Sequence, residues 1–149
     1  MCGQQKRAIS KFREALHGID NLYNTYAKSV GLNFEAILIL ELLYDSEVKY
    51  TQKGICEKLG LPKQLVNSII KVLWEKDYVE LIEAKDRRIK EIFLVEKGKE
   101  YAEVILKPLH NLEYKVWESF SSKEITNFAE TIEKYRASFE LALANTEIQ

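Results

Sequence analysis

The sequence predicts a mainly α-helical fold with one small β-hairpin near its centre. Apolar residues recur at steps of three and four over most of the chain, which is the spacing of amphipathic helices. Only 6 Gly and 2 Pro interrupt the 149 residues, so long helices are expected. Residues 78–95 are instead rich in β-branched and aromatic side chains, as strands are.

The composition is that of a globular chain, with 46% hydrophobic and 30% charged residues. The formal net charge is -1, so no overall positive field indicates binding to nucleic acid or to an anionic membrane. A nucleic-acid contact would have to depend on local clusters of charge. We find no signal peptide and no apolar run long enough to cross a bilayer, so we expect a cytoplasmic protein with no membrane contact.

A long first helix is predicted over residues 5–31. Its apolar residues form a narrow heptad seam on an otherwise polar surface: Ile9, Phe12, Leu16, Ile19, Tyr23, Tyr26 and Val30. Such a seam predicts packing against other helices. Gly31 and Asn33 break the pattern and are expected to end the helix.

Two shorter helices follow. Residues 34–44 are nearly all apolar, so this helix should be buried on most sides, and the polar residues 45–49 predict a turn. Thr51 is placed to cap a short helix that Gly60 ends. Its inward residues would be Ile55, Cys56 and Leu59.

A fourth helix is expected to begin with Pro62 at its first position, where the missing N–H costs nothing. Its core face would be Leu65, Val66, Ile69, Ile70 and Leu73. Its opposite face carries a polar stripe at positions i, i+3, i+4 and i+7: Gln64, Asn67, Ser68 and Lys71. A short helix, a tight turn with Gly and a longer helix are typical of a helix-turn-helix.

The hairpin follows, with strands predicted over residues 78–84 and 88–95 and a turn between them. The turn places four basic residues around Asp86: Lys85, Arg87, Arg88 and Lys90. Taken alone, this cluster fits a solvated hairpin tip as well as a binding site. Next to a helix-turn-helix, the hairpin predicts a winged helix.

Helical spacing returns over residues 97–146. In the first helix there, Pro108 is expected to cause a kink. The apolar residues of this helix are Tyr101, Val104, Ile105, Leu109, Leu112, Val116 and Phe120. Ser121 or Ser122 is expected to cap the last helix, with Glu124 in its first turn. The inner face of this helix would be Ile125, Phe128, Ala129, Ile132, Tyr135, Phe139 and Ala142.

We therefore predict a single domain, residues 1–149. A winged helix-turn-helix over residues 34–96, with its wing at residues 78–95, would lie between dimerisation helices at residues 5–31 and 97–146. The chain has too little other surface to cover the apolar stripes at both ends. A homodimer is the simplest arrangement that buries them.

The run from residue 51 to residue 101 resembles the MarR family of transcription regulators, and the resemblance extends over about residues 32–102. Its most specific element is DRR, residues 86–88, followed by an apolar strand and EKGKEY. Val95 stands where the family usually has Thr, which would remove a helix cap but not the fold. The resemblance implies a homodimer that binds a palindromic operator on double-stranded DNA, with repression as the family default.

The resemblance makes the fourth helix, which begins at Pro62, the recognition helix. Carboxamides of Gln64 and Asn67 suit adenine, and the ammonium of Lys71 suits guanine. Lys63 begins the same segment, and Ser68 is small enough for close approach or a phosphate contact. The alternative for this stripe is a solvated helix face.

The hairpin tip would then reach the minor groove, where narrow A·T-rich stretches deepen the negative potential. Either Arg87 or Arg88 would enter the groove; we favour Arg88 and expect the other to pair with Asp86. Lys85 and Lys90 would contact phosphates.

The family also implies a small aromatic effector bound between the dimer helices and the DNA-binding lobe. The aromatic residues near that junction are Tyr23, Tyr26, Phe34 and Tyr44, for which ordinary core packing is the alternative.

The sequence contains no nucleophile elbow and no phosphate loop, so we expect neither an enzyme nor a cofactor. The 2 Cys, Cys2 and Cys56, have no metal-ligand spacing, and we expect them to have no redox role. One other function stays open: a winged-helix protein-interaction module that does not bind DNA, which the near-neutral charge allows.

Overall fold

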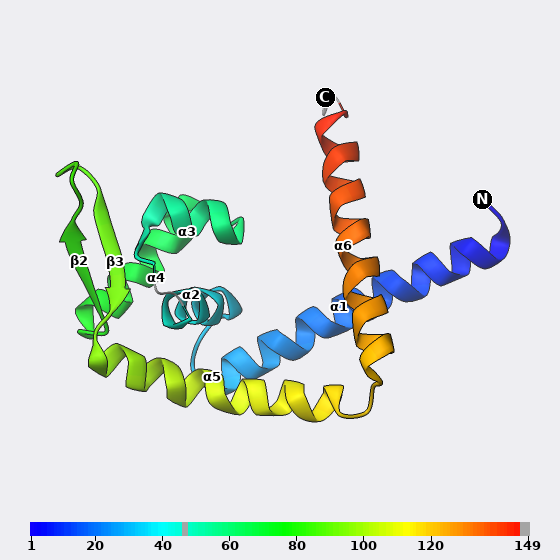
Figure 1. The fold of residues 1–149 in the computed structure, drawn as a ribbon, viewed down its shortest axis with the longest axis horizontal. Coiled ribbons are helices and arrows are strands. Elements are labelled where there is room, and N and C mark those ends of the chain that lie inside the picture. Colours follow the sequence, from blue (N-terminus) through cyan, green and yellow to red (C-terminus); the bar gives the residue numbers. More distant parts are fainter. Residues whose placement is uncertain (46–47, 147–149) are drawn as a thin grey trace. The chain divides into compact units, whose positions relative to one another are not determined.

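The structure is a computed structural model that describes residues 1–45 and 48–146. Its elements in chain order (Figure 1) are α1 Gly3–Ser29, α2 Phe34–Tyr44, β1 Tyr50–Thr51, α3 Gln52–Leu59, α4 Lys63–Glu75, β2 Val79–Glu83, β3 Lys90–Leu94, α5 Glu96–Trp117 and α6 Ser122–Ala144. They divide into two compact units, Met1–Leu109 and His110–Gln149. The predicted fold class is confirmed: the chain is mainly α-helical, with a small antiparallel sheet and a winged helix-turn-helix.

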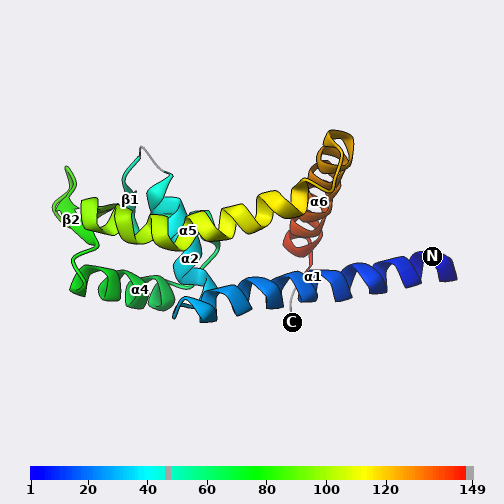
Figure 2. The ribbon, with the colours of Figure 1, turned by 90° about the horizontal axis from the view of Figure 1, so that it is seen from below.

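Helix α2 forms the centre of the first unit's core. Its sequence has no polar face, and Ile37, Ile39 and Leu40 have no exposed surface. The helix begins where the side chain of Asn33 accepts the main-chain N–H of Ala36 at 2.8 Å. It contacts α1, α3 and β3, and Figure 2 shows it next to α4 and α5 from a second direction.

Helix α1 ends in a left-handed turn at Gly31, whose φ is 74°. The N–H of Leu32 bonds to the carbonyl of Ala27 at 2.9 Å, and that of Gly31 bonds to Lys28 at 3.1 Å, which is the Schellman pattern of a helix C-terminus. The helix covers Gly3–Ser29, so both of its ends lie two residues before the predicted ones. Within α1 only Ala27 is buried.

The helix-turn-helix follows the local signals in the sequence. The hydroxyl of Thr51 accepts the N–H of Gly54 at 3.0 Å, and Gly60 ends α3 with a φ of 65°. Pro62 lies one residue earlier than predicted: it is the extended residue before α4, with a ψ of 141°, and its carbonyl accepts the N–H of Val66 at 3.1 Å. The buried residues of α4 belong to the predicted core face: Val66, Ile69, Ile70 and Leu73.

The sheet has three antiparallel strands in the order β1-β3-β2. The predicted hairpin is present, with Glu83 opposite Lys90 at its outer end. Strand β1 was not predicted, because its two residues are too few to show alternation; Tyr50 pairs with Ile92 of β3. Residues 46 and 47 of the predicted turn lie outside the described part of the chain.

The base of the hairpin packs tightly on α5. A Cβ atom added at Gly98 would lie 1.9 Å from the carbonyl oxygen of Tyr78, so this position admits only glycine. That same carbonyl accepts the N–H of Val95 at 3.1 Å. The rings of Tyr78 and Tyr101 stack at 4.3 Å between centroids. These contacts hold the wing on the helix that follows it.

The second unit contains the end of α5 and all of α6. Of the two predicted candidates, Ser121 caps α6: its hydroxyl accepts the N–H of Glu124 at 3.3 Å, and the carboxylate of Glu124 accepts the N–H of Ser121 at 2.9 Å. The hydroxyl of Ser121 also donates to this carboxylate at 2.7 Å, and the bonds from the hydroxyl and the N–H of Ser121 lower the pKa of Glu124. Helix α5 ends at Trp117, so Phe120 lies outside it, contrary to the prediction.

The predicted inner face of α6 is exposed. No residue of α6 is buried, and Phe128, Tyr135 and Phe139 are about half exposed, at 50%, 48% and 56%. The ring of Trp117 contacts Phe120 and Phe128, with centroids 5.3 and 5.8 Å away. Across the described ranges, none of the helices has the length and apolar character needed to span a bilayer.

Candidate nucleic-acid interface

Helix α4 divides into a buried face and an exposed polar face. The stripe predicted from the sequence lies wholly on the exposed face: Gln64, Asn67, Ser68 and Lys71, with Lys63 exposed at the start of the helix. Because the opposite face of α4 packs in the core, the helix holds these side chains in a fixed position at the surface. A recognition helix needs this division of faces.

Two residues that sequence reasoning missed contact the stripe. The Nε2 of Gln52 in α3 donates to the Oδ1 of Asn67 at 3.1 Å. Glu75, at the end of α4, lies 3.8 Å from the ammonium of Lys71. The i,i+4 spacing of Lys71 and Glu75 could have indicated their pair. No local pattern could have indicated the bond between Gln52 and Asn67, which joins two helices.

The hairpin tip is a closed turn. The N–H of Ala84 bonds to the carbonyl of Ile89 at 2.9 Å, and the N–H of Ile89 bonds to the carbonyl of Asp86 at 2.9 Å. The carboxylate of Asp86 accepts the main-chain N–H of Arg88 at 3.1 Å. Aspartate commonly stabilises turns from this position.

The expected pairing of Asp86 with an arginine side chain is therefore corrected. Asp86 fixes the main chain of the tip, and within the described ranges neither Arg87 nor Arg88 forms an ion pair. All four basic side chains of the tip are exposed: Lys85, Arg87, Arg88 and Lys90. The tip thus keeps its full set of cations available.

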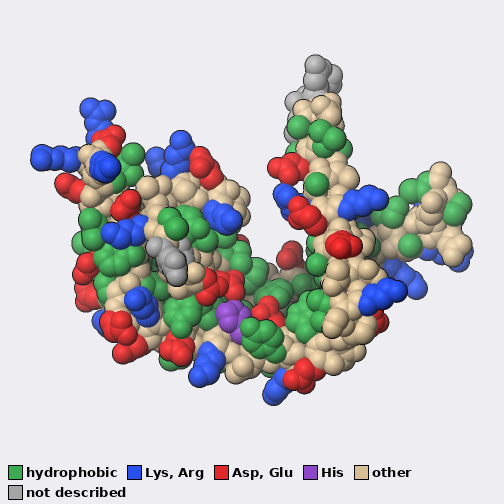
Figure 3. Space-filling view, viewed as in Figure 1, with side chains coloured by type: hydrophobic (Ala, Val, Ile, Leu, Met, Phe, Trp, Pro, Cys, Tyr) green, Lys and Arg blue, Asp and Glu red, His purple; other side chains and the backbone are tan. Residues whose placement is uncertain are grey.

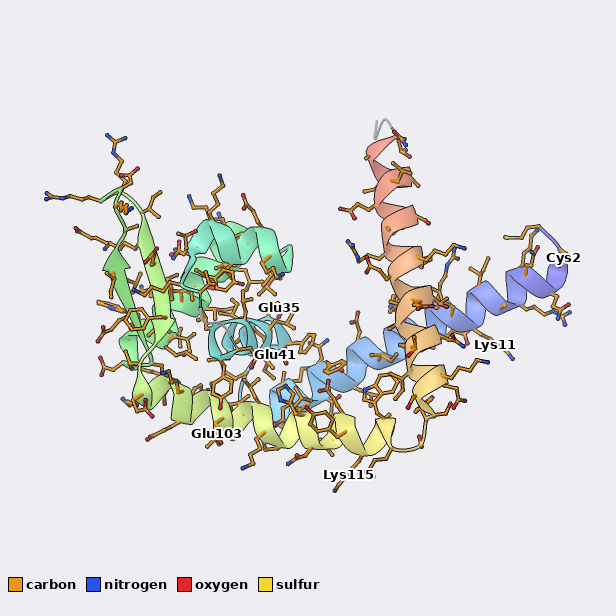
Figure 4. All side chains as sticks on the ribbon, viewed as in Figure 1. Cys2, Lys11, Glu35, Glu41, Glu103 and Lys115 are labelled. Carbon is orange, nitrogen blue, oxygen red and sulfur yellow. The ribbon has the colours of Figure 1, made fainter. Side chains whose placement is uncertain are left out.

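Positive charge gathers locally although the chain is nearly neutral. In the space-filling view, Lys and Arg side chains cluster at the hairpin tip and over α3 (Figure 3). In the stick view, the long side chains of the tip extend into solvent (Figure 4). A protruding cluster of this kind produces a positive local potential that the net charge of -1 does not reveal.

The four aromatic candidates for ligand binding do not form one group. Tyr23 and Phe34 stack with ring centroids 4.9 Å apart. The hydroxyl of Tyr26 donates to the carbonyl of Ile105 at 2.7 Å, and burial raises the pKa of Tyr26. Tyr44 ends α2, ten residues after Phe34 and so about 15 Å along the helix. The junction of α1, α2 and α5 thus contains three of the four.

Both cysteines are free, Cys2 exposed and Cys56 half-buried. In the part of the chain that the structure describes, no group of three or more His, Cys, Asp or Glu is arranged to hold a metal ion.

Comparison with known proteins connects these features to a family. A family model described as the MarR family matches residues 30–89. The fold is similar to that of a MarR family regulator from Neisseria meningitidis, with a TM-score of 0.79, 27% identity, and coverage of 92% of this chain and 96% of that one. A search of curated proteins with the sequence gives no match.

Two further solved structures agree with this chain in fold alone. One is MepR of S. aureus in a DNA-binding conformation, with 20% identity, a TM-score of 0.74, and coverage of 89% of this chain and 98% of that one. The other is a MarR/EmrR family transcriptional regulator from Acinetobacter sp. ADP1, with 23% identity, a TM-score of 0.73, and coverage of 94% and 99%. By the family match over residues 30–89 and by its fold, this chain is similar to the MarR family of winged helix-turn-helix transcription regulators.

Proposed function

We propose that this chain is a cytoplasmic, sequence-specific DNA-binding regulator that represses transcription as a homodimer on a palindromic operator. The observation that carries the proposal is the pairing of two exposed features in one unit. Helix α4 presents a polar stripe from a buried support, and the adjacent hairpin presents four unburied cations at its tip. The first suits base edges in a major groove, and the second suits a minor groove beside it.

In the major groove, the side chains of α4 would read base edges. The carboxamide of Gln64 can donate and accept across the edge of adenine, and the ammonium of Lys71 can donate to guanine. The hydroxyl of Ser68 already donates to the carbonyl of Leu65 at 2.8 Å, so its oxygen faces outward as an acceptor at most. Ser68 therefore serves close approach rather than readout.

In the minor groove, we place Arg88 ahead of Arg87 as the inserted residue. The main chain of Arg88 is held by the carboxylate of Asp86, so less order is lost when its side chain is fixed in the groove. Lys85 and Lys90 flank the turn and would contact phosphates. Their contribution would be independent of sequence and would weaken steeply as salt rises.

The apolar stripes outside the core support the homodimer. Within α1, Leu16 and Ile19 are 45% and 44% exposed, and in the second unit Phe128 and Phe139 are similarly open. Soluble monomers rarely leave apolar surfaces of this extent uncovered. A two-fold dimer would cover them and would present two α4 helices to half-sites about one DNA turn apart.

A small aromatic effector would act at the junction of α1, α2 and α5. Tyr23 and Phe34 offer a stacked pair of rings there, and the bond of Tyr26 to Ile105 links α1 to α5. A ligand that opened the stack would shift α1 against α2. Such a shift would alter the separation of the two α4 helices and relieve repression.

Selection of bound sequences from random duplex DNA tests the proposal. We expect a palindrome with half-sites about one turn apart and an affinity that falls steeply as salt rises. A protein that selects no sequence and that heparin does not retain even in dilute buffer would instead be the winged-helix protein-interaction module.

A further inference from the structure

We infer that Gln52 orients the side chain of Asn67 and thereby determines which base Asn67 recognises. The inference rests on the proposed DNA-binding function and adds a specificity-determining residue outside α4. Gln52 is the first residue of α3, next to the capping residue Thr51. Its Nε2 donates to the Oδ1 of Asn67 at 3.1 Å, across the turn that separates the two helices.

As the structure places the two carboxamides, Gln52 donates and Asn67 accepts. A carboxamide carries its oxygen on one side and its two N–H donors on the other. With the oxygen held toward α3, Asn67 presents its N–H donors to the groove. Guanine, whose major-groove edge carries two acceptors, is then the base that fits best. The adenine pairing expected from the sequence needs the oxygen that Gln52 engages.

On its own helix, Asn67 has Gln64 three residues before it, whose carboxamide could also bond to it, but in the part of the chain that the structure describes the bond of the Asn67 side chain is to Gln52. The lysines four residues away cannot set this orientation. The residues four positions before and after it are Lys63 and Lys71, and an ammonium group only donates. Either lysine could approach the oxygen of Asn67 but neither could accept from its nitrogen. Moreover, Lys71 lies 3.8 Å from the carboxylate of Glu75. Gln52 is both half-buried and bonded to Asn67, so the orientation depends on it.

A single change should reverse the orientation. In Gln52→Glu, the new carboxylate only accepts, so Asn67 must turn its nitrogen toward α3 and its oxygen toward the groove. The preferred base would then be one that donates, adenine or cytosine. An acidic residue in the first turn of a helix is favourable, so α3 should keep its structure.

The experiment selects random duplex DNA with the full-length protein and four variants. Asn67→Ala locates the base that Asn67 contacts in each half-site. We expect guanine there for the unchanged protein and adenine or cytosine for Gln52→Glu, with relative affinities reversed by at least about fivefold. Lys53→Gln makes the same change of charge one residue along α3. It should weaken binding evenly and leave the base preference unchanged.

Each outcome decides between the inference and the function on which it rests. If the unchanged protein prefers adenine at the Asn67 position, or if Gln52→Glu binds with an unchanged preference, the inference is overturned and the regulator stands. If Gln52→Glu does not bind, Gln52→Ala decides: a preference broadened to adenine and guanine supports the inference, and an unchanged guanine overturns it. If the unchanged protein selects no sequence, the proposed function itself fails.

Discussion

Helices α2 and α6 are both rich in apolar residues, but those of α2 are buried and those of α6 are largely exposed. Ile37, Ile39 and Leu40 of α2 have no exposed surface, whereas Phe128 and Phe139 of α6 are 50% and 56% exposed. An apolar helix must pack against other apolar residues, but its sequence pattern does not show whether these belong to the same chain. Helix α2 packs against residues of the same chain. For α6 we attribute the packing partner to a second copy of the chain.

Substitutions of apolar residues should therefore have different consequences in the two units. A charge placed in α2 should destroy the fold, and a charge placed on α6 should destroy the assembly. Changes at the surface that we propose faces DNA should affect neither.

The largest effect is expected at the centre of the first unit. Ile39→Asp would bury an unpaired carboxylate at a position with no exposed surface. The loss should exceed about 4 kcal/mol, enough to unfold a domain of ordinary stability. Circular dichroism would show a loss of the cooperative thermal transition. A protein that unfolds cooperatively near the original temperature would contradict the central place of α2.

Phe139→Asp places a charge on the exposed apolar face of α6. Each chain should stay folded, but the dissociation constant of the dimer should rise by about a thousandfold, because a two-fold interface carries the change twice. Sedimentation equilibrium measures the effect. Asn127→Asp adds the same charge off the apolar stripe of α6 and should leave the dimer intact. A Phe139→Asp protein that is still dimeric would show that α6 is not an interface.

Replacing both Arg87 and Arg88 with Ala should separate DNA binding from both core and assembly. We expect affinity for the selected site to fall by about a hundredfold, with unchanged stability and dimerisation. Mobility-shift titration measures the loss. Lys6→Ala with Arg7→Ala removes two exposed cations from the start of α1 and should cost far less. Equal losses in the two double variants would refute a specific role for the hairpin tip.

Gly98→Ala tests the packing of the wing on α5. The added Cβ would lie 1.9 Å from the carbonyl of Tyr78, so the main chain must shift. The free energy of unfolding should fall by about 2 kcal/mol. Gly18→Ala, in open space within α1, should instead raise it by about 0.5–1 kcal/mol. Denaturant titration compares the two, and equal effects would contradict the close approach.

The smallest effect is expected from Glu75→Gln. Removing this carboxylate releases Lys71 from a pair at 3.8 Å and removes a negative charge from α4. Affinity for the selected site should rise about threefold, since an exposed pair of this kind is weak. Glu103→Gln makes the same change of charge on α5 and serves as the control. A decrease for Glu75→Gln alone would place Glu75 among the base-reading residues.

Local chemistry made much of the fold predictable. Thr51 and Ser121 cap helices, and Gly60 ends one, because each acts on its own main chain within a few residues. Two features could not be predicted from the sequence, because they depend on contacts between separate elements. Strand β1 exists through its pairing with β3, and the bond of Gln52 to Asn67 joins two helices. For Asp86, the sequence correctly predicted a residue that fixes the turn. Only the structure distinguished its hydrogen bond to the main chain from an ion pair with an arginine side chain.

Hydroxyl-radical footprinting of the selected site tests the central claim most directly, because it reports where two copies lie on the duplex. We predict protection that is symmetric about the centre of the site, with the outer minor-groove segments lost when both Arg87 and Arg88 become Ala. One unsymmetrical protected segment, or outer protection that survives the double change, would contradict the placement of α4 and the hairpin tip in adjacent grooves.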